Sequence, residues 1–311
     1  MPARTDILDR LRPGDGIAVI RLRSLGDCVL STPALHLLKA HRPDLRVAVV
    51  VEDRFRDIFQ GNPEIDALLP PRAADIRAFR PALCLNLHGG TRSARLTLLS
   101  GARFRAGFDI FRPGWIYNTP IPTAQEILGV DRAVHTAEHA ASAMFYLGVP
   151  ITEVPRAFVP APAGRSAFAP ASPYAVIHPF AATPEKTWPM SSFLELARYV
   201  SQSLDLEPVF IGAGSDDISA LSGWRTVVGS RLAEIARLMC DAALFLGNDS
   251  GPAHVAAAFG VPEVVLFGPS SLDTWAPWRT PAEAIKADGP IASLPVSCVV
   301  GAIERLQARA A

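Results

Sequence analysis

The sequence lacks several features that mark common classes of protein. Its four cysteines, Cys28, Cys84, Cys240 and Cys298, are isolated and form no CxxC pair, so neither a disulfide framework nor a metal knuckle is indicated. Lys plus Arg and Asp plus Glu number 30 each, so the whole molecule has no field that attracts nucleic acid, although local patches remain possible. No stretch reaches the ~20 apolar residues of a membrane span, and residues 1–16 contain no apolar signal core. We therefore expect a cytoplasmic protein.

What the sequence does contain is a regular alternation of short apolar runs and helical patterns. In the first half, strands are expected at residues 16–22, 46–52, 65–69, 83–87 and 105–108, and helices at 27–40, 55–60 and 134–147. In the second half, strands are expected at 174–178, 208–211, 226–228, 242–246 and 261–267, and helices at 191–203, 216–221, 232–240, 253–259 and 299–310. Strands that alternate with helices over so many units predict an α/β fold with parallel sheets covered on both faces.

A proline-rich segment divides this alternation in two. Six prolines fall between positions 150 and 173, and we take residues 160–172 as an interdomain linker. The prediction is a Rossmann-like domain at 1–159 and a second at 173–295. Because ligands of such sheets bind at the carboxyl ends of the strands, we expect the site in a cleft between the domains. The last helix, in 296–311, has no sheet partner in this prediction and could pack back on the first domain.

The most informative stretch is LFLGNDSGPAHVAAAFGVPEVVLFGP, residues 244–269. It predicts a strand, a tight loop, a helix that Gly260 ends, and a second strand. Pro252 suits the first helical position, and Asp249 or Ser250 can cap the helix from just before it. The loop offers free backbone N–H groups and the positive end of a helix. We interpret it as the place where a nucleotide diphosphate binds.

Three other segments carry candidate chemistry, each with a plainer alternative. RLRSLGDCVLSTP, residues 21–33, places the carboxylate of Asp27 at a strand-to-helix turn, where residue type alone favours a helix cap. IHPFAATPEKTWP, residues 177–189, can bring the ammonium of Lys186 to phosphate oxygens, although a lone lysine is more often solvated. FIGAGSDD, residues 210–217, ends in two aspartates that could accept hydrogen bonds from ribose or cap a helix.

The ordered set RLRSLGD, IHPFAATPEKTWP, IGAGSDD and GNDSGPAHVAAAFGVPEVVLFGP, with LNLHGGTRSARL between the first two, resembles the bacterial heptosyltransferase family, glycosyltransferase family nine. The resemblance covers nearly the whole chain. It implies a GT-B fold, in which two Rossmann-like domains face each other across a cleft and the second binds most of the donor. It also implies transfer of L-glycero-D-manno-heptose from an ADP-activated donor to the inner core of lipopolysaccharide, with inversion and without a cofactor or bound metal.

The resemblance assigns roles to individual residues. Asp27 matches the proposed general base, which takes the proton of the attacking sugar hydroxyl. Lys186 matches the lysine that neutralises the leaving diphosphate. The segment 229–232 matches the loop beside adenine. We call residues 249–251 the phosphate loop. Outside it, the donor-binding candidates are Ser24, Gly26, His178, Thr183, Asp216, Gly229, Ser230 and Leu232.

The phosphate loop itself matches the family at three consecutive positions, Asp249, Ser250 and Gly251. His254 follows one turn later, where it could face the donor or lie buried in helix packing. The segment 177–189 contains Lys186, and we call it the lysine loop. It departs from the family, because some relatives have hydroxyl residues where this chain has Ala181 and Ala182. That departure puts side-chain contacts to phosphate in doubt there, although backbone contacts could remain.

Two further groups of residues have open interpretations. Arg92 and Arg95 fall where the first domain is expected to face the acceptor, and they could bind its anionic groups or form a solvated helix face. His135 and His139 have the i, i+4 spacing of metal ligands, but HTAEH is not a zincin motif, and we expect both on a helix surface.

The expected partners are a nucleotide-sugar donor and a glycolipid acceptor at the inner face of the cytoplasmic membrane, where the protein could be peripheral, and no nucleic acid. Two alternatives remain at this point. One is a related transferase that uses another nucleotide sugar for another cell-surface glycan. The other is a sugar-nucleotide-binding protein without turnover.

Overall fold

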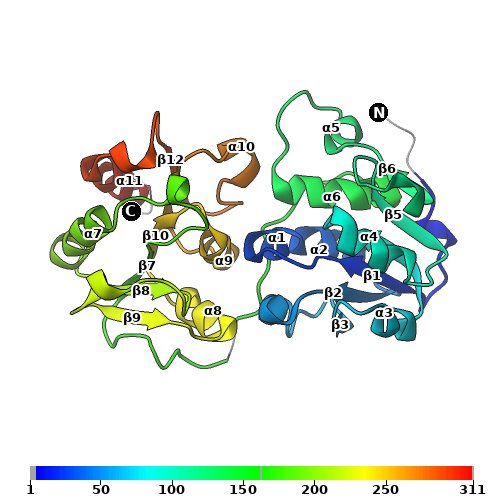
Figure 1. Ribbon diagram of the computed structural model, residues 1–311, viewed down its shortest axis with the longest axis horizontal. Coiled ribbons are helices and arrows are strands. Elements are labelled where there is room, and N and C mark those ends of the chain that lie inside the picture. The colour runs from blue at the N-terminus through cyan, green and yellow to red at the C-terminus, as the bar shows by residue number, and fades with distance from the viewer. Residues whose placement is uncertain (1–4, 162, 310–311) are drawn as a thin grey trace. The chain divides into compact units, whose positions relative to one another are not determined.

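The computed structural model describes residues 5–161 and 163–309, and the chain divides into two compact units after Pro160. Each unit is built around one six-stranded sheet in which every pair of neighbouring strands is parallel (Figure 1). The predicted α/β class with parallel sheets is confirmed. Among the described residues, no helix has both the length and the apolar character needed to cross a bilayer.

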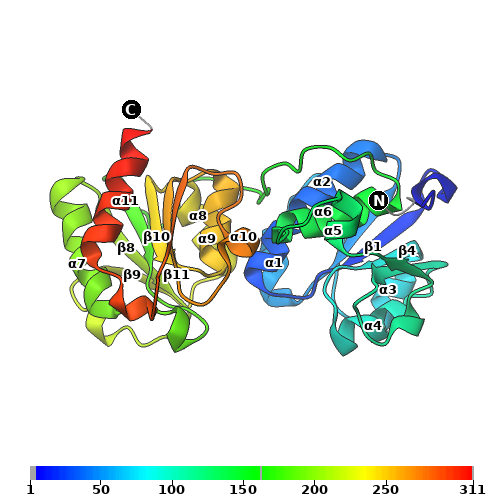
Figure 2. The ribbon, with the colours of Figure 1, turned by 90° about the horizontal axis from the view of Figure 1, so that it is seen from above.

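The sheet of the first unit has the strand order β3-β2-β1-β4-β5-β6. Its strands are β1 (Gly16–Ile20), β2 (Arg46–Val50), β3 (Ala67–Leu69), β4 (Pro81–Asn86), β5 (Phe104–Phe108) and β6 (Thr119–Ile121). One face carries α1 (Leu25–Leu30), α2 (Thr32–His41), α5 (Ala124–Leu128) and α6 (Thr136–Leu147), and the other carries α3 (Ala73–Phe79) and α4 (Gly90–Leu98) (Figure 2). Because both faces are covered, β1 is buried along its whole length and reads as an unbroken apolar run.

The sheet of the second unit has the strand order β12-β11-β10-β7-β8-β9. Its strands are β7 (Tyr174–His178), β8 (Glu207–Gly212), β9 (Arg225–Val228), β10 (Leu244–Asn248), β11 (Glu263–Phe267) and β12 (Ala282–Lys286). One face carries α7 (Met190–Ser203) and α11 (Val296–Ala308), and the other carries α8 (Leu232–Cys240) and α9 (Gly251–Phe259) (Figure 2). A short helix, α10 (Leu272–Trp275), precedes β12.

Both sheets share one topology, since in each the chain order reverses beside the first strand. In the first sheet the reversal lies between β1 and β4, and in the second between β7 and β10. Ligands of open parallel sheets bind at the carboxyl ends of the strands that flank such a switch point. The fold therefore directs attention to the loops that follow these four strands.

The last helix differs from the sequence-based expectation. Instead of lacking a sheet partner, α11 packs in its own unit against α7, β11 and β12. Its residues Val299, Ala302, Ile303 and Leu306 are buried in the core cluster of the second sheet. The reason is the added edge strand β12, which the sequence analysis did not predict and which widens the sheet that α11 covers.

Smaller differences concern short elements. The helix expected at residues 216–221 is a tight turn followed by a 3-10 helix, Ser219–Leu221, and that expected at 55–60 is a 3-10 helix, Asp53–Ile58. The edge strand β6, like β12, was not predicted. Both edge strands are short or only partly buried, so they lack the long apolar run that identifies central strands.

Candidate functional site

At the switch point of the second sheet, Lys186 and Asp249 form an ion pair. Lys186 Nζ lies 3.0 Å from Asp249 Oδ2, although the two residues are 63 positions apart in the chain. The Asp249 side chain is 7% exposed and that of Lys186 is 32% exposed, so the carboxylate lies inside while the ammonium reaches solvent. An ammonium has three donors, so Lys186 can keep this carboxylate and still bind an anion.

A second contact joins the same two strand ends. Nδ1 of His178, the last residue of β7, lies 3.0 Å from Oγ of Ser250, which directly precedes α9. Burial lowers the pKa of His178 to about 4, so the imidazole is neutral at pH 7. The hydroxyl of Ser250 and the first backbone N–H groups of α9 thus lie beside Lys186, where the positive end of the helix favours an anion.

Asn248 fixes the lysine loop to the end of β10. Its side chain accepts a hydrogen bond from the backbone N–H of Trp188 (3.0 Å) and donates one to the carbonyl of Pro179 (2.9 Å). The loop also packs tightly on the end of β11, since a Cβ added to Gly268 would clash with the carbonyl oxygen of Glu185. The sequence analysis did not identify Asn248, whose role depends on contacts between distant segments.

The other predicted site residues of the second unit each have contacts of their own. Thr183 directly precedes the 3-10 turn Pro184–Lys186 and lines an open pocket of about 450 Å³ on the lysine loop. The carboxylate of Asp216 accepts a hydrogen bond from the N–H of Ala213 (2.7 Å) and so closes its own turn. His254 is 3% exposed and packs near Trp275, which matches the buried alternative for this histidine.

The predicted adenine loop follows β9. Gly229 has φ +65°, in the left-handed region that favours glycine, and it is exposed. Ser230 and Leu232 are half-buried, and Leu232 begins α8. Gly251 is the first residue of α9. These positions are at the carboxyl ends of β9 and β10, on the same edge of the sheet as His178.

In the first unit, Asp27 lies just beyond the end of β1. Its Oδ2 accepts hydrogen bonds from the Ser24 hydroxyl (2.9 Å) and backbone N–H (3.3 Å), and its Oδ1 accepts one from Arg21 Nη1 (3.2 Å). The carboxylate therefore caps α1, as the plainer alternative proposed, while 26% of its side chain stays exposed. Gly26 is buried in the first turn of the same helix.

Arg21 is a component that the sequence analysis passed over. Its side chain is 6% exposed, and burial lowers its pKa while the nearby Asp27 raises it. The cation is thus held inside the unit, with the carboxylate as its ionic partner. The only sequence signal was its position directly after β1, within RLRSLGD.

Two histidines belong to the same neighbourhood. Burial, with a contribution from the positive charge of Arg21, lowers the pKa of His88 below its usual value and that of His139 to about 4. His139 stacks on Phe108 with ring centroids 4.0 Å apart. The prediction that His135 and His139 lie on a helix surface is wrong, because His135 is 5% exposed and accepts a hydrogen bond from Ala137 N–H at the start of α6.

The two predicted acceptor arginines are exposed on α4. Arg92 donates to Glu52 across a distance of 2.8 Å, and Glu52 follows β2, so this pair is at the carboxyl edge of the first sheet. Arg95 lies nearly one turn further along the helix.

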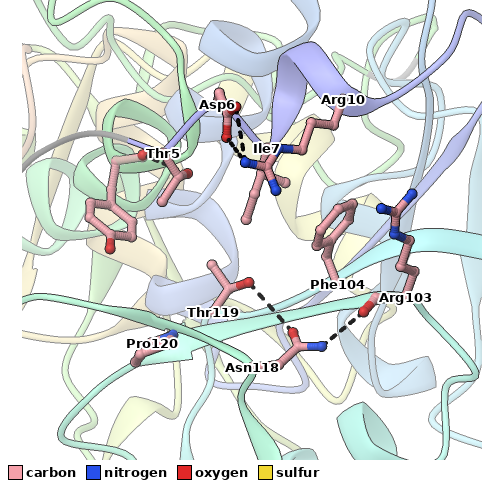
Figure 3. A pocket seen from close by; sticks show the side chains of 10 residues that line it. Thr5, Asp6, Ile7, Arg10, Arg103, Phe104, Asn118, Thr119 and Pro120 are labelled. Carbon is pink, nitrogen blue, oxygen red and sulfur yellow. Dashed lines mark hydrogen bonds and ion pairs between the residues drawn. The ribbon is translucent and has the colours of Figure 1, made fainter.

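Another pocket, of about 480 Å³, lies at the opposite edge of the first sheet, where β5 and β6 begin (Figure 3). Arg10 pairs there with Asp6, and Asn118 donates to the carbonyl of Arg103. None of the predicted site residues lines it. Within residues 5–161 and 163–309, no group of three or more His, Cys, Asp or Glu side chains could hold a metal ion.

Comparisons with known proteins agree with the sequence resemblance. The family model "Glycosyltransferase family 9 (heptosyltransferase)" matches residues 75–295, more than half of the chain. Lipopolysaccharide heptosyltransferase 3 of Escherichia coli is 26% identical over 299 residues, covering 83% of this chain and 84% of the relative. Lipopolysaccharide heptosyltransferase 1 of Salmonella typhimurium is 24% identical and covers 82% of this chain and 88% of the relative.

Solved structures show the same fold. A family 9 glycosyl transferase from Veillonella parvula aligns with TM-score 0.83 and 21% identity, over 97% of this chain and 98% of the other. ADP-heptose lps heptosyltransferase II of Escherichia coli aligns with TM-score 0.80 and 22% identity, over 94% and 99% of the two chains. The predicted GT-B fold is thereby confirmed, and with the family match over most of its length this chain belongs to glycosyltransferase family 9, the heptosyltransferases.

Proposed function

We propose that this glycosyltransferase moves a heptose from ADP-heptose to an inner-core acceptor of lipopolysaccharide, with inversion at the anomeric carbon. The observation that carries the proposal is the convergence of Lys186, Asp249, His178 and Ser250 at the switch point of the second sheet. A cation, a hydroxyl and a helix N-terminus at one strand edge suit a nucleotide diphosphate. Relatives named as lipopolysaccharide heptosyltransferases support the choice of sugar and acceptor.

In the proposed reaction an acceptor hydroxyl attacks the anomeric carbon while the bond to the diphosphate oxygen breaks. The carboxylate of Asp27 takes the hydroxyl proton, and ADP leaves with the bonding electron pair. One displacement on the face opposite the leaving group inverts the configuration. General-base help of this kind contributes about 10²- to 10⁴-fold to the rate.

The leaving diphosphate gains negative charge as its bond to the sugar breaks. We assign its stabilisation to the Lys186 ammonium, the Ser250 hydroxyl and the backbone N–H groups at the start of α9. Groups that are already in place cost no reorganisation when the charge develops. The contacts of Lys186 with Asp249 and of Ser250 with His178 support this role, because they hold both donors in position.

On the acceptor side, we assign Arg21 to orienting Asp27, and Arg92 and Arg95 to anionic groups of the acceptor. The reaction needs no cofactor and no metal in this proposal, since the diphosphate is neutralised by the protein. We place the enzyme in the cytoplasm, at the inner face of the membrane that holds the glycolipid acceptor, with no nucleic acid as partner.

A donor screen tests the proposed function. ADP-, UDP- and GDP-sugars are compared for their effect on the melting temperature and for product formed with a lipopolysaccharide-core acceptor. A ligand that binds only the native state raises the melting temperature by mass action. We expect ADP-heptose to stabilise the protein and give product. Stabilisation by a UDP- or GDP-sugar instead would contradict the assignment of the donor, and binding without product would contradict the assignment of turnover.

A further inference from the structure

The loop between β5 and β6 exposes two large apolar side chains. Trp115 is 72% exposed and Ile110 is 59% exposed, and they are the two most exposed large apolar residues in the described part of the chain. Both belong to residues 109–118, which we call the aromatic loop. Single exposed apolar residues are ordinary, but two on one loop, including a tryptophan, call for a physical reason.

Loose packing of the aromatic loop does not explain the exposure of these two side chains. The neighbours of Trp115 are buried, with Ile116 at 4% and Tyr117 at 6% exposed, and both pack against Ala94 of α4. Phe111 contacts Phe108 edge to face, with ring centroids 5.7 Å apart. The aromatic loop is therefore anchored to the unit on both sides of its tip, and it presents Ile110 and Trp115 from a fixed base.

The segments next to this loop in the sequence are rich in arginine, although the whole chain has no net charge. Residues 81–121 contain five arginines and one aspartate, against 30 basic and 30 acidic residues in the full sequence. Arg95, Arg103 and Arg112 are exposed, and in the described part of the chain none of them pairs with a carboxylate. Leu98, 37% exposed, lies about one helical turn beyond Ala94, the α4 residue that packs against the aromatic loop.

We propose that the aromatic loop and the adjoining surface of α4 dock on an anionic lipid bilayer, with Trp115 and Ile110 entering the boundary between headgroups and acyl chains. Tryptophan favours that boundary, and arginines are attracted to anionic headgroups. Two projecting apolar tips among cations suit a bilayer better than a protein partner, whose interface needs a wider apolar core. The role of this surface rests on the proposed glycolipid acceptor.

Vesicle flotation tests the proposal without donor or acceptor, so its failure is distinct from a failure of the proposed transfer. The full-length protein is mixed with vesicles of phosphatidylcholine alone, or of phosphatidylcholine with phosphatidylglycerol. We expect binding to the anionic vesicles, weakened by salt and by removing phosphatidylglycerol. Trp115→Ser and Ile110→Ser should each lower the bound-to-free ratio about tenfold, because each removes an inserted apolar group.

Matched variants separate docking from folding and catalysis. Arg112→Gln should weaken binding and reduce its dependence on salt, whereas Phe158→Ser, at another exposed apolar residue (45%), should leave binding unchanged. Transfer to a delipidated core oligosaccharide should be unchanged in Trp115→Ser. The proposal is overturned if the wild type binds neither vesicle, or if Trp115→Ser and Ile110→Ser bind as the wild type does. Self-association of the wild type that these variants abolish, without vesicle binding, would assign the loop to a protein contact instead.

Discussion

Asp27 is held at both of its carboxylate oxygens, by Arg21 on one and Ser24 on the other. In the proposed mechanism, a base positioned in this way needs little further ordering when an acceptor arrives. The sequence predicted Asp27 from its turn, and offered a cap and a base as alternatives. The structure shows that one carboxylate can satisfy the cap geometry and remain partly exposed, so the two roles are compatible.

Arg21→Gln tests whether Arg21 positions this carboxylate. We expect kcat to fall about 10- to 100-fold, since a small misplacement of a reacting group can cost that much, while the KM for the donor stays the same. Steady-state kinetics measure both parameters. Arg21→Lys should recover part of kcat because it restores the positive charge. A purely structural role would instead lower the melting temperature and affect both variants without this split.

Among the elements, the lysine loop depends most clearly on a distant residue, Asn248. The sequence predicts β7, β10 and the long loop after β7, because each has its own local pattern. It does not predict that the amide of Asn248 joins Pro179 to Trp188, since no local pattern encodes a contact across about 60 to 70 residues. The same limit explains why Arg21, His88 and His139 were not grouped in advance: they come from three different parts of the first unit.

Asn248→Ala removes both hydrogen bonds and leaves the Trp188 N–H and the Pro179 carbonyl without this partner. Each unsatisfied buried group costs about 1–3 kcal/mol, so with two such groups the free energy of unfolding should fall by about 2–6 kcal/mol, and ADP should bind more weakly. Urea unfolding and ligand titration measure the two effects. Thr187→Val removes an exposed hydrogen bond in the same loop and serves as the control. If Asn248→Ala lowered the free energy of unfolding no more than Thr187→Val does, the anchoring role of Asn248 would be contradicted.

Across the whole molecule the net charge is zero, but individual ionisable side chains lie in very different local environments. Partly buried histidines with lowered pKa values occur in both units, His139 in the first and His178 in the second. Composition gave only a net charge of zero, so it could not predict these environments. The edge strands β6 and β12 were not predicted either. Their formation depends on pairing with the neighbouring strand more than on their own residues.

The pH dependence of stability follows from these histidines. The pKa of His139 is about 4 in the folded protein against a usual 6.5, so the unfolded chain binds more protons between these values. Stability is therefore present at pH 7 and is lost as the pH falls, by up to about 1.4 kcal/mol per pH unit for one histidine. Glu263, whose pKa burial raises, acts in the opposite direction.

Because these effects oppose each other, the informative quantity is the difference between His139→Asn and the wild type. Asparagine cannot take up the proton, so the variant should lose less stability than the wild type between pH 7 and pH 5. Urea unfolding at several pH values measures it. Parallel curves for the two proteins would show that His139 does not control acid sensitivity.

The proposed mechanism divides the work between the two units: Asp27 activates the acceptor, while Lys186 and the 249–251 loop hold the diphosphate. A comparison of Asp27→Asn with the wild type, for the rate of heptose transfer and for the affinity for ADP-heptose, separates these two tasks. We expect a rate lower by about 10²- to 10⁴-fold with unchanged donor affinity. Transfer at the wild-type rate by Asp27→Asn would contradict the mechanism.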